Sequence, residues 1–176
     1  WLVAANLAPD AVIAYHAALQ FHGRAYSLSD EVAFLSDRAV RTREYRGYRF
    51  RRVGYPKALR LAGQEQFGVQ TVDRQGLDVR VTSLERSLVD VLDRPDLGGG
   101  WEEVWRSLES VEYYDLGLVV SYALLLQNAT TAAKVGFFLE QHRAQLGVGE
   151  GHVAKLREAR PAQPRYLEPG TSGRLD

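Results

Sequence analysis

The order of patterns along the 176 residues predicts an α+β fold. A helical periodicity opens the chain, alternating strand patterns joined by glycine turns follow, and the second half holds about four amphipathic helical patterns. Because the strands are gathered in one stretch, they favour a small antiparallel or mixed sheet of hairpins over a parallel βαβ sheet. We expect residues 1–160 to form one domain and the proline-rich residues 161–176 to be extended or disordered.

The composition excludes several classes of protein. The chain has no cysteine, which excludes disulfides and thiolate metal sites, and its longest apolar stretch, residues 116–126, is too interrupted to cross a bilayer. No secretory leader pattern is present, so we expect no membrane partner and a cytoplasmic location. The chain also has no methionine, and we interpret it as a fragment that lacks its N-terminal neighbour.

The first helix is expected over residues 9–22. Pro9 and Asp10 suit its first turn, since proline fixes φ there and the acid lies at the positive end of the helix dipole. Apolar residues then recur at three- and four-residue spacing. Gly23 can take the left-handed conformation that ends a helix.

Strand patterns follow this helix. Residues 31–36 form a short apolar run, typical of a buried strand. Residues 40–45 and 48–53 flank an Arg-Gly dipeptide and predict a hairpin, because glycine readily takes a positive φ. Residues 67–82 alternate apolar and polar side chains around a second glycine turn, which predicts a hairpin with one buried and one solvated face.

Helix signals fill the rest of the chain. Thr82 and Glu85 have the spacing of a capping box, in which a hydroxyl and a carboxylate satisfy free amides at the start of a helix. That helix should end before Pro95, and three glycines at 98–100 should form a flexible corner. Residues 101–111 predict another helix, with two tryptophans on its buried face.

Two further helices are expected towards the end. Apolar residues recur on one side of each pattern. Asp115 is placed to cap the first, and Thr130 or Thr131 to cap the second, which spans about residues 132–145. Gly147 should end the second helix.

The charge pattern points to a candidate binding surface. Residues 38–60 hold nine basic residues and one acid, Glu44, whereas residues 61–140 hold thirteen acidic and six basic residues. We therefore expect a basic side and an acidic side of the domain.

The basic hairpin within this stretch is the candidate site. Arg41 and Arg43 share a face of its first strand. Arg49 and Arg51 share a face of its second strand, and across the hairpin the two pairs are expected to form one positive surface for phosphate. The alternative is an edge strand that its charge protects from aggregation. The residues assigned to contact with a nucleic acid or another partner are Arg41, Arg43, Arg46, Arg49, Arg51 and Arg52.

The chain shows no metal-binding, cofactor or catalytic motif. His16 and His22 lie six residues apart, and His142 and His152 lie across a glycine-rich break, so neither pair has the spacing of a helical metal site. Without cysteine or a Gly-x-Ser-x-Gly elbow, nucleophilic catalysis has no candidate. We therefore expect no catalytic residue, no metal and no cofactor.

Two alternative functions remain open. A metal-dependent nuclease or nucleotidyltransferase-like enzyme would depend on the carboxylates of Asp73, Asp78, Glu85 and Asp90. Against it, charged hairpin residues usually face solvent, and the capping box already accounts for one of these acids. A protein-interaction module would instead present the aromatic residues Trp101, Trp105, Tyr113 and Tyr114.

Two segments resemble a known family. Residues 10–23 (DAVIAYHAALQFHG) and residues 81–95 (VTSLERSLVDVLDRP), with the glycines after them, are similar to segments of the C-terminal domain of AbiEi-type antitoxins. These antitoxins are the abortive-infection transcriptional regulators of type IV toxin–antitoxin systems. The resemblance covers about residues 1–160, and each segment is distinctive only in combination with the other.

The resemblance implies a regulator rather than an enzyme. It implies a winged-helix DNA-binding domain before Trp1, through which operator DNA would mainly be bound. It also implies neutralisation of a nucleotidyltransferase-like toxin. A homo-oligomer would be compatible with such a regulator.

Overall fold

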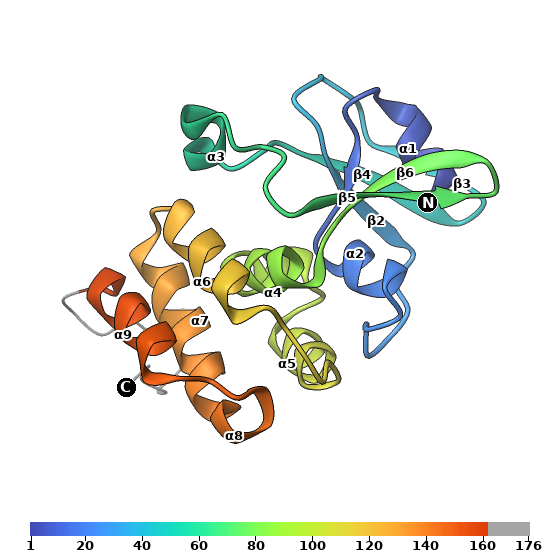
Figure 1. Cartoon of the computed structure of the whole chain (residues 1–176). Helices are drawn as coiled ribbons and strands as arrows, with labels where there is room; N and C mark the ends of the chain where they lie inside the picture. The colour runs from blue at the N-terminus through green and yellow to red at the C-terminus, as the bar shows by residue number, and fades with distance from the viewer. Residues whose placement is uncertain (162–176) are drawn as a thin grey trace.

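The structure is a computed structural model that describes residues 1–161. It confirms the predicted α+β class: a six-stranded mixed sheet is accompanied by helices that lie mostly in the C-terminal half (Figure 1). In chain order the sheet half consists of α1 (Leu2–Leu7), β1 (Val12–Ile13), α2 (His16–Phe21), β2 (Glu31–Leu35), β3 (Arg43–Tyr45), β4 (Tyr48–Val53), α3 (Lys57–Ala62), β5 (Val69–Arg74) and β6 (Leu77–Thr82). The helical half consists of α4 (Leu84–Asp93), the 3-10 turn η1 (Pro95–Leu97), α5 (Trp101–Glu109), α6 (Leu116–Leu125), α7 (Ala129–Gln141), α8 (Arg143–Leu146) and α9 (Glu150–Ala159).

The sheet is mixed because two chain crossovers join its hairpins. Its strand order is β3-β4-β2-β1-β6-β5, with β2–β4 and β1–β6 parallel and the other neighbours antiparallel. The two hairpins, β3–β4 and β5–β6, therefore form the two opposite edges. The second strand of each hairpin pairs with a central strand: β4 pairs with β2, and β6 pairs with β1.

The predicted helix over residues 9–22 is wrong in its first half. A short helix, α1, precedes it, and residues 12 and 13 form the central strand β1. Val12 pairs with Leu35 and Ile13 pairs with Phe34, so these consecutive apolar residues are buried on opposite faces of the sheet. Such a pattern is typical of a central strand.

The second half of that prediction is confirmed. Tyr15 has a positive φ of 57°, which separates β1 from α2. Gly23 has φ 68° and ends α2 in the left-handed conformation, as the sequence predicts.

Both hairpins are confirmed, with small shifts at their ends. Arg46 and Gly47 have φ values of 50° and 80°, so both take the positive φ of a tight two-residue turn. Gln75 and Gly76 form an equivalent turn with φ values of 59° and 78°. The first strands are shorter than predicted, beginning at residue 43 and at residue 69.

The predicted capping box before α4 is wrong by one residue. Thr82 still belongs to β6, where it pairs with Val69, and its hydroxyl lies 2.8 Å from that of Ser87. Ser83 is the N-cap instead, and its hydroxyl accepts the Arg86 N–H at 3.3 Å. Glu85 accepts the backbone N–H of a distant residue, Asp115, at 3.3 Å.

The later helices follow the prediction in part. Asp115 caps α6 by accepting the Leu118 N–H at 3.1 Å. Asn128 caps α7, so the prediction of Thr130 or Thr131 is wrong: both threonines donate their backbone N–H groups to the Asn128 side chain. The helices α1, α3 and α9 were not predicted, because each buries only one or two side chains and so shows little amphipathic pattern.

The core lies on both faces of the sheet. One cluster joins α1 and α2 to one face through residues such as Ile13, Phe34 and Val81. A larger cluster fills the space between the other face and the helices and includes Leu35 and Leu88. In the described part of the chain no helix is both long and apolar enough to cross a membrane. Of the predicted tail, residues 162–176 lie outside the described residues.

Candidate nucleic-acid interface

The hairpin β3–β4 does not place its arginines on one surface. Its two-residue turn pairs Tyr45 with Tyr48, Glu44 with Arg49, and Arg43 with Phe50. Directly opposed residues of an antiparallel pair share a face, and successive residues alternate between faces. The prediction that Arg41 and Arg43 form one positive surface with Arg49 and Arg51 is therefore wrong.

One face of the hairpin carries mixed charge. Arg49 and Arg51 lie there beside Glu31 of the neighbouring strand, with nitrogen–oxygen distances of 4.0 and 3.3 Å. Glu44 faces the same way, opposite Arg49. A surface hollow near the turn is lined by Asp30 and both glutamates, and also by Tyr45, Arg46 and Arg49. These acids offset the arginines and make this face a poor match for phosphate.

The other face combines arginine with exposed aromatic rings. Tyr45 and Tyr48 are 52% and 47% exposed, and they share this face with Arg43. The Arg46 guanidinium lies over the Tyr45 ring, 5.4 Å from its centroid. Phe50, on the same face, is buried and anchors the hairpin to the core. We call Arg43, Tyr45, Arg46 and Tyr48 the tyrosine–arginine tip.

Much of the positive charge near this tip is not paired. Among residues 1–161, no ion pair joins a carboxylate to any of five arginines, namely Arg38, Arg41, Arg43, Arg46 and Arg52. Arg52 donates instead to the backbone oxygen of Ser36 at 2.9 Å. The exposed members of this group remain available for an anionic partner.

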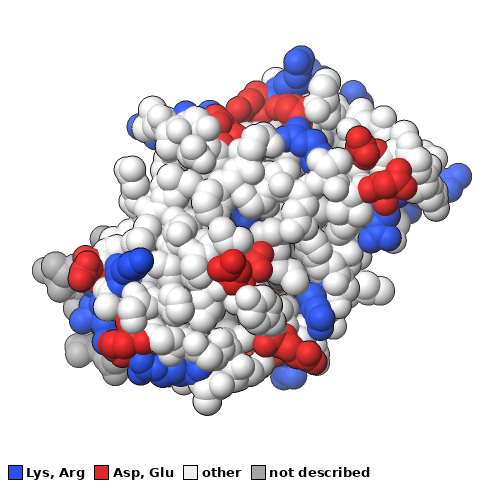
Figure 2. Space-filling model, viewed as in Figure 1, with Lys and Arg blue, Asp and Glu red and all other residues white. Residues whose placement is uncertain are grey.

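The expected separation of the domain into a basic and an acidic side is not seen on the face shown in Figure 2. Lys and Arg side chains are interspersed there with Asp and Glu side chains around the rim, and an acidic group also lies near the middle of this face. The folded chain brings opposite charges together. Arg106 and Glu102 pair within one helix, and Arg157 pairs with Glu140 of another helix. Local placement therefore matters more here than the count of charges along the chain.

Glu103 is the centre of a buried polar network. It accepts hydrogen bonds from the Ser27 backbone and hydroxyl at 3.0 and 2.6 Å and from Ser107 at 2.9 Å, and His16 Nε2 lies 3.0 Å from it. Burial would raise the pKa of Glu103, but the hydrogen bonds from Ser27, His16 and Ser107 outweigh it and lower the pKa to about 2. The network ties α5 to α2 and to the loop before β2.

A second buried network surrounds Arg86 in α4. Its Nη1 donates to the backbone oxygens of Glu65 and Phe67 at 2.8 and 2.7 Å, and its Nε lies 3.4 Å from Asp90. Tyr122 donates to Asp90 at 2.7 Å. Burial raises the pKa of Asp90 to about 6, although the charge of Arg86 and the Tyr122 hydrogen bond oppose the rise. This network fixes the loop before β5 to α4 and α6.

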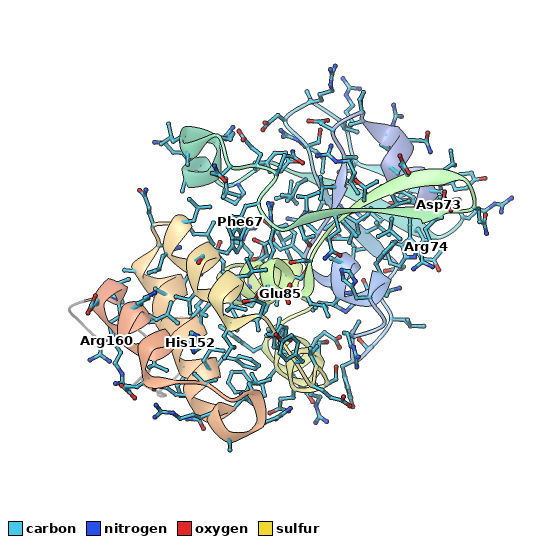
Figure 3. The ribbon with its side chains drawn as sticks, viewed as in Figure 1. Phe67, Asp73, Arg74, Glu85, His152 and Arg160 are labelled. Carbon is cyan, nitrogen blue, oxygen red and sulfur yellow. The ribbon has the colours of Figure 1, made fainter. Side chains whose placement is uncertain are left out.

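The carboxylates of the enzyme alternative do not form a cluster. Asp73 and Asp78 face each other near the exposed turn of β5–β6, whereas Asp90 is buried against Arg86. Figure 3 shows Asp73 near that turn and Glu85 well apart from it at the start of α4. In the described part of the chain no group of three or more His, Asp or Glu residues is placed to hold a metal ion.

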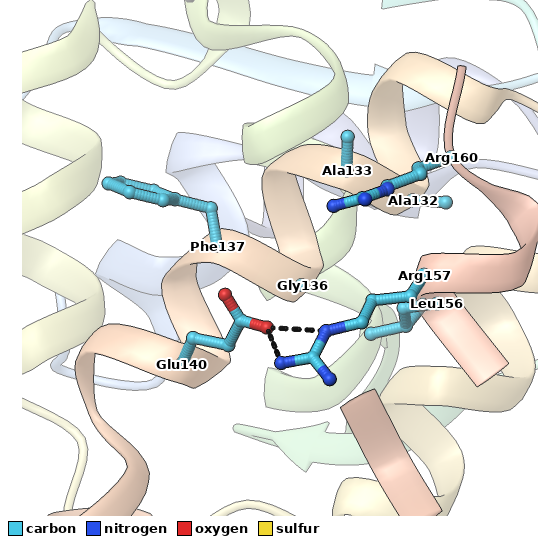
Figure 4. Close-up of a pocket in the computed structure, with 8 residues that line it drawn as sticks. All are labelled: Ala132, Ala133, Gly136, Phe137, Glu140, Leu156, Arg157 and Arg160. Atoms are coloured by element: carbon cyan, nitrogen blue, oxygen red, sulfur yellow. Dashed lines mark hydrogen bonds and ion pairs between the residues drawn. The ribbon is translucent and has the colours of Figure 1, made fainter. Parts of the chain in front are cut away.

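The cavity between α7 and α9 is too small for an ordinary ligand. It has a volume of about 40 Å³ and is lined by side chains that include Phe137, Leu156 and Arg160 (Figure 4). Arg157 and Glu140 close one side through contacts of 2.7 and 3.0 Å. Ligand pockets usually measure about 300–1,000 Å³, so this gap is a packing feature between helices.

The aromatic residues of the interaction alternative differ in exposure. Tyr114 is buried, whereas Tyr113 is 76% exposed. Trp101 and Trp105 are only partly buried, and Trp105 packs against Phe138. The prediction that both tryptophans lie on a buried face is therefore right only in part.

The outer side of α6 is a surface that the sequence interpretation missed. Residues 116–133 contain no Asp, Glu, Lys or Arg, yet Leu118 is 43% exposed and Ser121 is exposed. A helix that is apolar all round is usually buried. The lack of charge over this stretch is the signal that could have identified the surface.

Comparison with known proteins adds no assignment. No family model matches the chain, and no curated protein matches its sequence. The tip and the outer side of α6 are therefore the surfaces of this chain that bear on its function.

Proposed function

We propose that this domain is the effector part of an antitoxin-type transcriptional regulator and has no enzymatic activity of its own. In this role it supports binding of operator DNA and neutralises a nucleotidyltransferase-like toxin. The observation that carries the proposal is the tyrosine–arginine tip, which presents arginine without ion-paired acids at an edge of the sheet. The resemblance to AbiEi-type antitoxins supplies the class of regulator.

The role of the tip is electrostatic. Arginine side chains that contact phosphates fix the position of a protein on DNA, while sequence is read elsewhere. A winged-helix domain before Trp1 would supply that reading in the proposed regulator. The tip would add affinity that falls with salt concentration, because each phosphate contact releases counterions.

The outer side of α6 favours a protein partner for the same domain. Its exposed Leu118 and the charge-free stretch around it match the uncharged centre of a protein–protein interface. This surface and the tip lie in different halves of the fold (Figure 1), so DNA and toxin need not compete for one site. We assign the toxin contact to α6.

Fluorescence anisotropy with an operator duplex and a scrambled duplex tests the DNA role. The double variant Arg43→Gln with Arg46→Gln should bind both duplexes several-fold more weakly at low salt, with a salt slope reduced by about one per arginine. Arg94→Gln with Arg106→Gln is the matched control, since it removes two exposed arginine charges outside the hairpin. Equal losses in the two double variants, or no binding by the wild type, would contradict the DNA role.

Co-expression with the toxin tests the protein role. Leu118→Glu places a charge on α6 and should abolish protection against a nucleotidyltransferase-like toxin encoded beside the regulator. Leu61→Glu is the matched control, because Leu61 on α3 is 78% exposed. Protection by the Leu118 variant equal to that by the wild type would exclude α6 as the contact surface.

A further inference from the structure

We propose that the tyrosine–arginine tip binds single-stranded nucleic acid, with Tyr45 and Tyr48 stacking on unpaired bases and Arg43 and Arg46 contacting the backbone. This inference rests on the proposed nucleic-acid role of the hairpin and specifies its ligand. It implies that the tip contacts melted or looped strands in addition to, or in place of, the duplex.

The first argument is the arrangement of the rings. Tyr45 and Tyr48 are directly opposed across β3–β4, so they lie side by side on one face, and about half of each is exposed. Sites that bind single strands combine aromatic platforms with positive charge along the backbone. Paired bases of a duplex offer no open face to such rings, whereas unpaired bases do.

The second argument is the position of the arginines. Arg43 is two residues before Tyr45 on the same strand face, and the Arg46 guanidinium lies 5.4 Å from the centroid of the Tyr45 ring. Positive groups therefore border the aromatic pair at its side and at the turn. By strand register Glu31 and Glu44 lie on the opposite face, although near the turn they line one surface hollow together with Tyr45 and Arg46.

The third point concerns the backbone of the turn. Arg46 adopts a positive φ of 50°, which asparagine, aspartate and glycine tolerate better than arginine does. Gln75 of the second hairpin takes the same conformation, with φ 59°, so the turn sets the geometry of the tip and does not by itself indicate a ligand. The turn also holds Tyr45 and Tyr48 in one fixed register.

The cross-strand pair has a structural alternative, in which the rings only stabilise the hairpin. The hairpin β5–β6 has the same kind of turn and no such aromatic pair, since Arg74 faces Leu77 there. A tight X-Gly hairpin in this sheet therefore forms without a cross-strand pair of tyrosines, which leaves the exposed rings of the tip available for a ligand.

The test compares the affinity of a labelled twelve-nucleotide oligothymidylate with that of a twelve-base-pair duplex of unrelated sequence. Wild-type protein should bind the single strand more tightly. Tyr45→Leu and Tyr48→Leu should each weaken single-strand binding about tenfold, because stacking contributes about 1–3 kcal/mol per base and 1.4 kcal/mol is a factor of ten. Duplex affinity should change less than twofold.

Tyr26→Leu is the matched control. Tyr26 is 60% exposed and has Arg106 4.9 Å from its ring centroid, so it reproduces an exposed tyrosine–arginine contact outside the hairpin. The Tyr45→Phe with Tyr48→Phe variant should retain single-strand affinity, since phenylalanine keeps the stacking face. A single strand that contains 2-aminopurine gives a direct signal from the wild type, because its fluorescence should fall on binding as the base stacks.

The outcomes separate this inference from the proposed function. Unchanged oligothymidylate binding by both leucine variants, equal loss in the phenylalanine and leucine variants, or unquenched 2-aminopurine in the complex would overturn the stacking role. If binding of the single strand depends on the tyrosines but no operator is bound, the stacking role stands and the proposed regulator function is contradicted. If operator binding depends on Arg43 and Arg46 but not on the tyrosines, the proposed regulator function stands and the stacking role is contradicted.

Discussion

The two halves of the sheet have the same plan but different chemistry. Each ends in an edge hairpin whose two-residue turn has positive φ at both positions, Arg46–Gly47 in one and Gln75–Gly76 in the other. Beside the first turn stand a Tyr–Tyr pair and a Glu–Arg pair. Beside the second stand an Arg–Leu pair and two opposed aspartates. Backbone geometry is therefore shared, and the difference in side chains is the basis for the proposed ligand of the first hairpin.

The halves also differ in how they are held to the helices. The segment before β2 is bound by an acid, Glu103 of α5, through Ser27. The segment before β5 is bound by a base, Arg86 of α4, through the backbone oxygens of Glu65 and Phe67. Buried charges of opposite sign thus hold both halves, while the hairpin tips at solvent are free to differ in function.

The largest effect is expected from breaking the Arg86 anchor. Arg86→Met should lower the free energy of unfolding by about 3–5 kcal/mol, because it leaves Asp90 buried without its partner and frees the loop before β5. Urea unfolding measures the change. Arg86→Met with Asp90→Leu should recover part of the loss, since both buried charges are then removed. A loss below about 1 kcal/mol in the single variant would mean that the second half of the sheet is held in another way.

The Glu103 anchor should give the next largest effect. Glu103→Gln should cost roughly 2 kcal/mol at pH 7, because hydrogen bonds to a charged group contribute about 1.5–3 kcal/mol each and the amide keeps only some of them. Urea unfolding at pH 7 gives the size of the loss. Ser107→Ala removes one hydrogen bond only and should cost less.

The pH dependence of stability identifies the acid as the cause. The pKa of Glu103 is about 2 in the folded protein, below the unfolded value near 4.3, so its contribution is fully present above about pH 4.5 and is lost as the pH falls towards 2. Asp90 has the opposite sign, since its raised pKa makes the folded state lose stability as the pH rises from about 4 to 6. The unfolding free energy of the Glu103 variant should therefore be flatter than that of the wild type below pH 4.5. An unchanged slope there would contradict this assignment.

Part of this comparison can be predicted from the amino-acid sequence. The two X-Gly dipeptides predict both hairpins, and a two-residue turn at Arg46–Gly47 necessarily pairs Glu44 with Arg49. That register alone separates the arginines into two faces, so the turn type itself predicts two arginine surfaces instead of one. The α+β class follows from the order of the patterns, because hairpins and helices occupy separate stretches of chain.

The rest depends on contacts with no local signal. His16 and Glu103 are 87 residues apart, and each looks like an ordinary helical side chain. The strand β1 lies in an apolar segment whose spacing also fits a helix, and only the sheet around it decides the outcome. The capping residue of α4 was missed because the ladder pair of Thr82 with Val69 delays the helix by one residue.

A matched pair of glycine variants separates stability from ligand binding. Gly47→Ala and Gly76→Ala both place a Cβ at a positive φ, near 80°, in otherwise open space, so each should cost about 1 kcal/mol. Thermal unfolding should give similar shifts for the two. Only Gly47→Ala should weaken nucleic-acid binding, measured by anisotropy at a temperature where both variants are folded. Equal binding losses would show that the tip has no special role.

The smallest effect concerns the opposed aspartates of the second hairpin. Asp73 and Asp78 are direct neighbours across β5–β6, and like charges in such positions repel each other. Asp78→Asn should raise the free energy of unfolding by a few tenths of a kcal/mol at low salt, with the gain reduced in about 1 M salt by screening. Asp73→Asn should gain less, because Asp73 also accepts the Gly76 N–H at 3.3 Å within the turn. Neither substitution alters the first hairpin, so the affinity for the single strand should remain that of the wild type. A changed affinity would mean that the charge of the whole sheet, rather than the tip, determines binding.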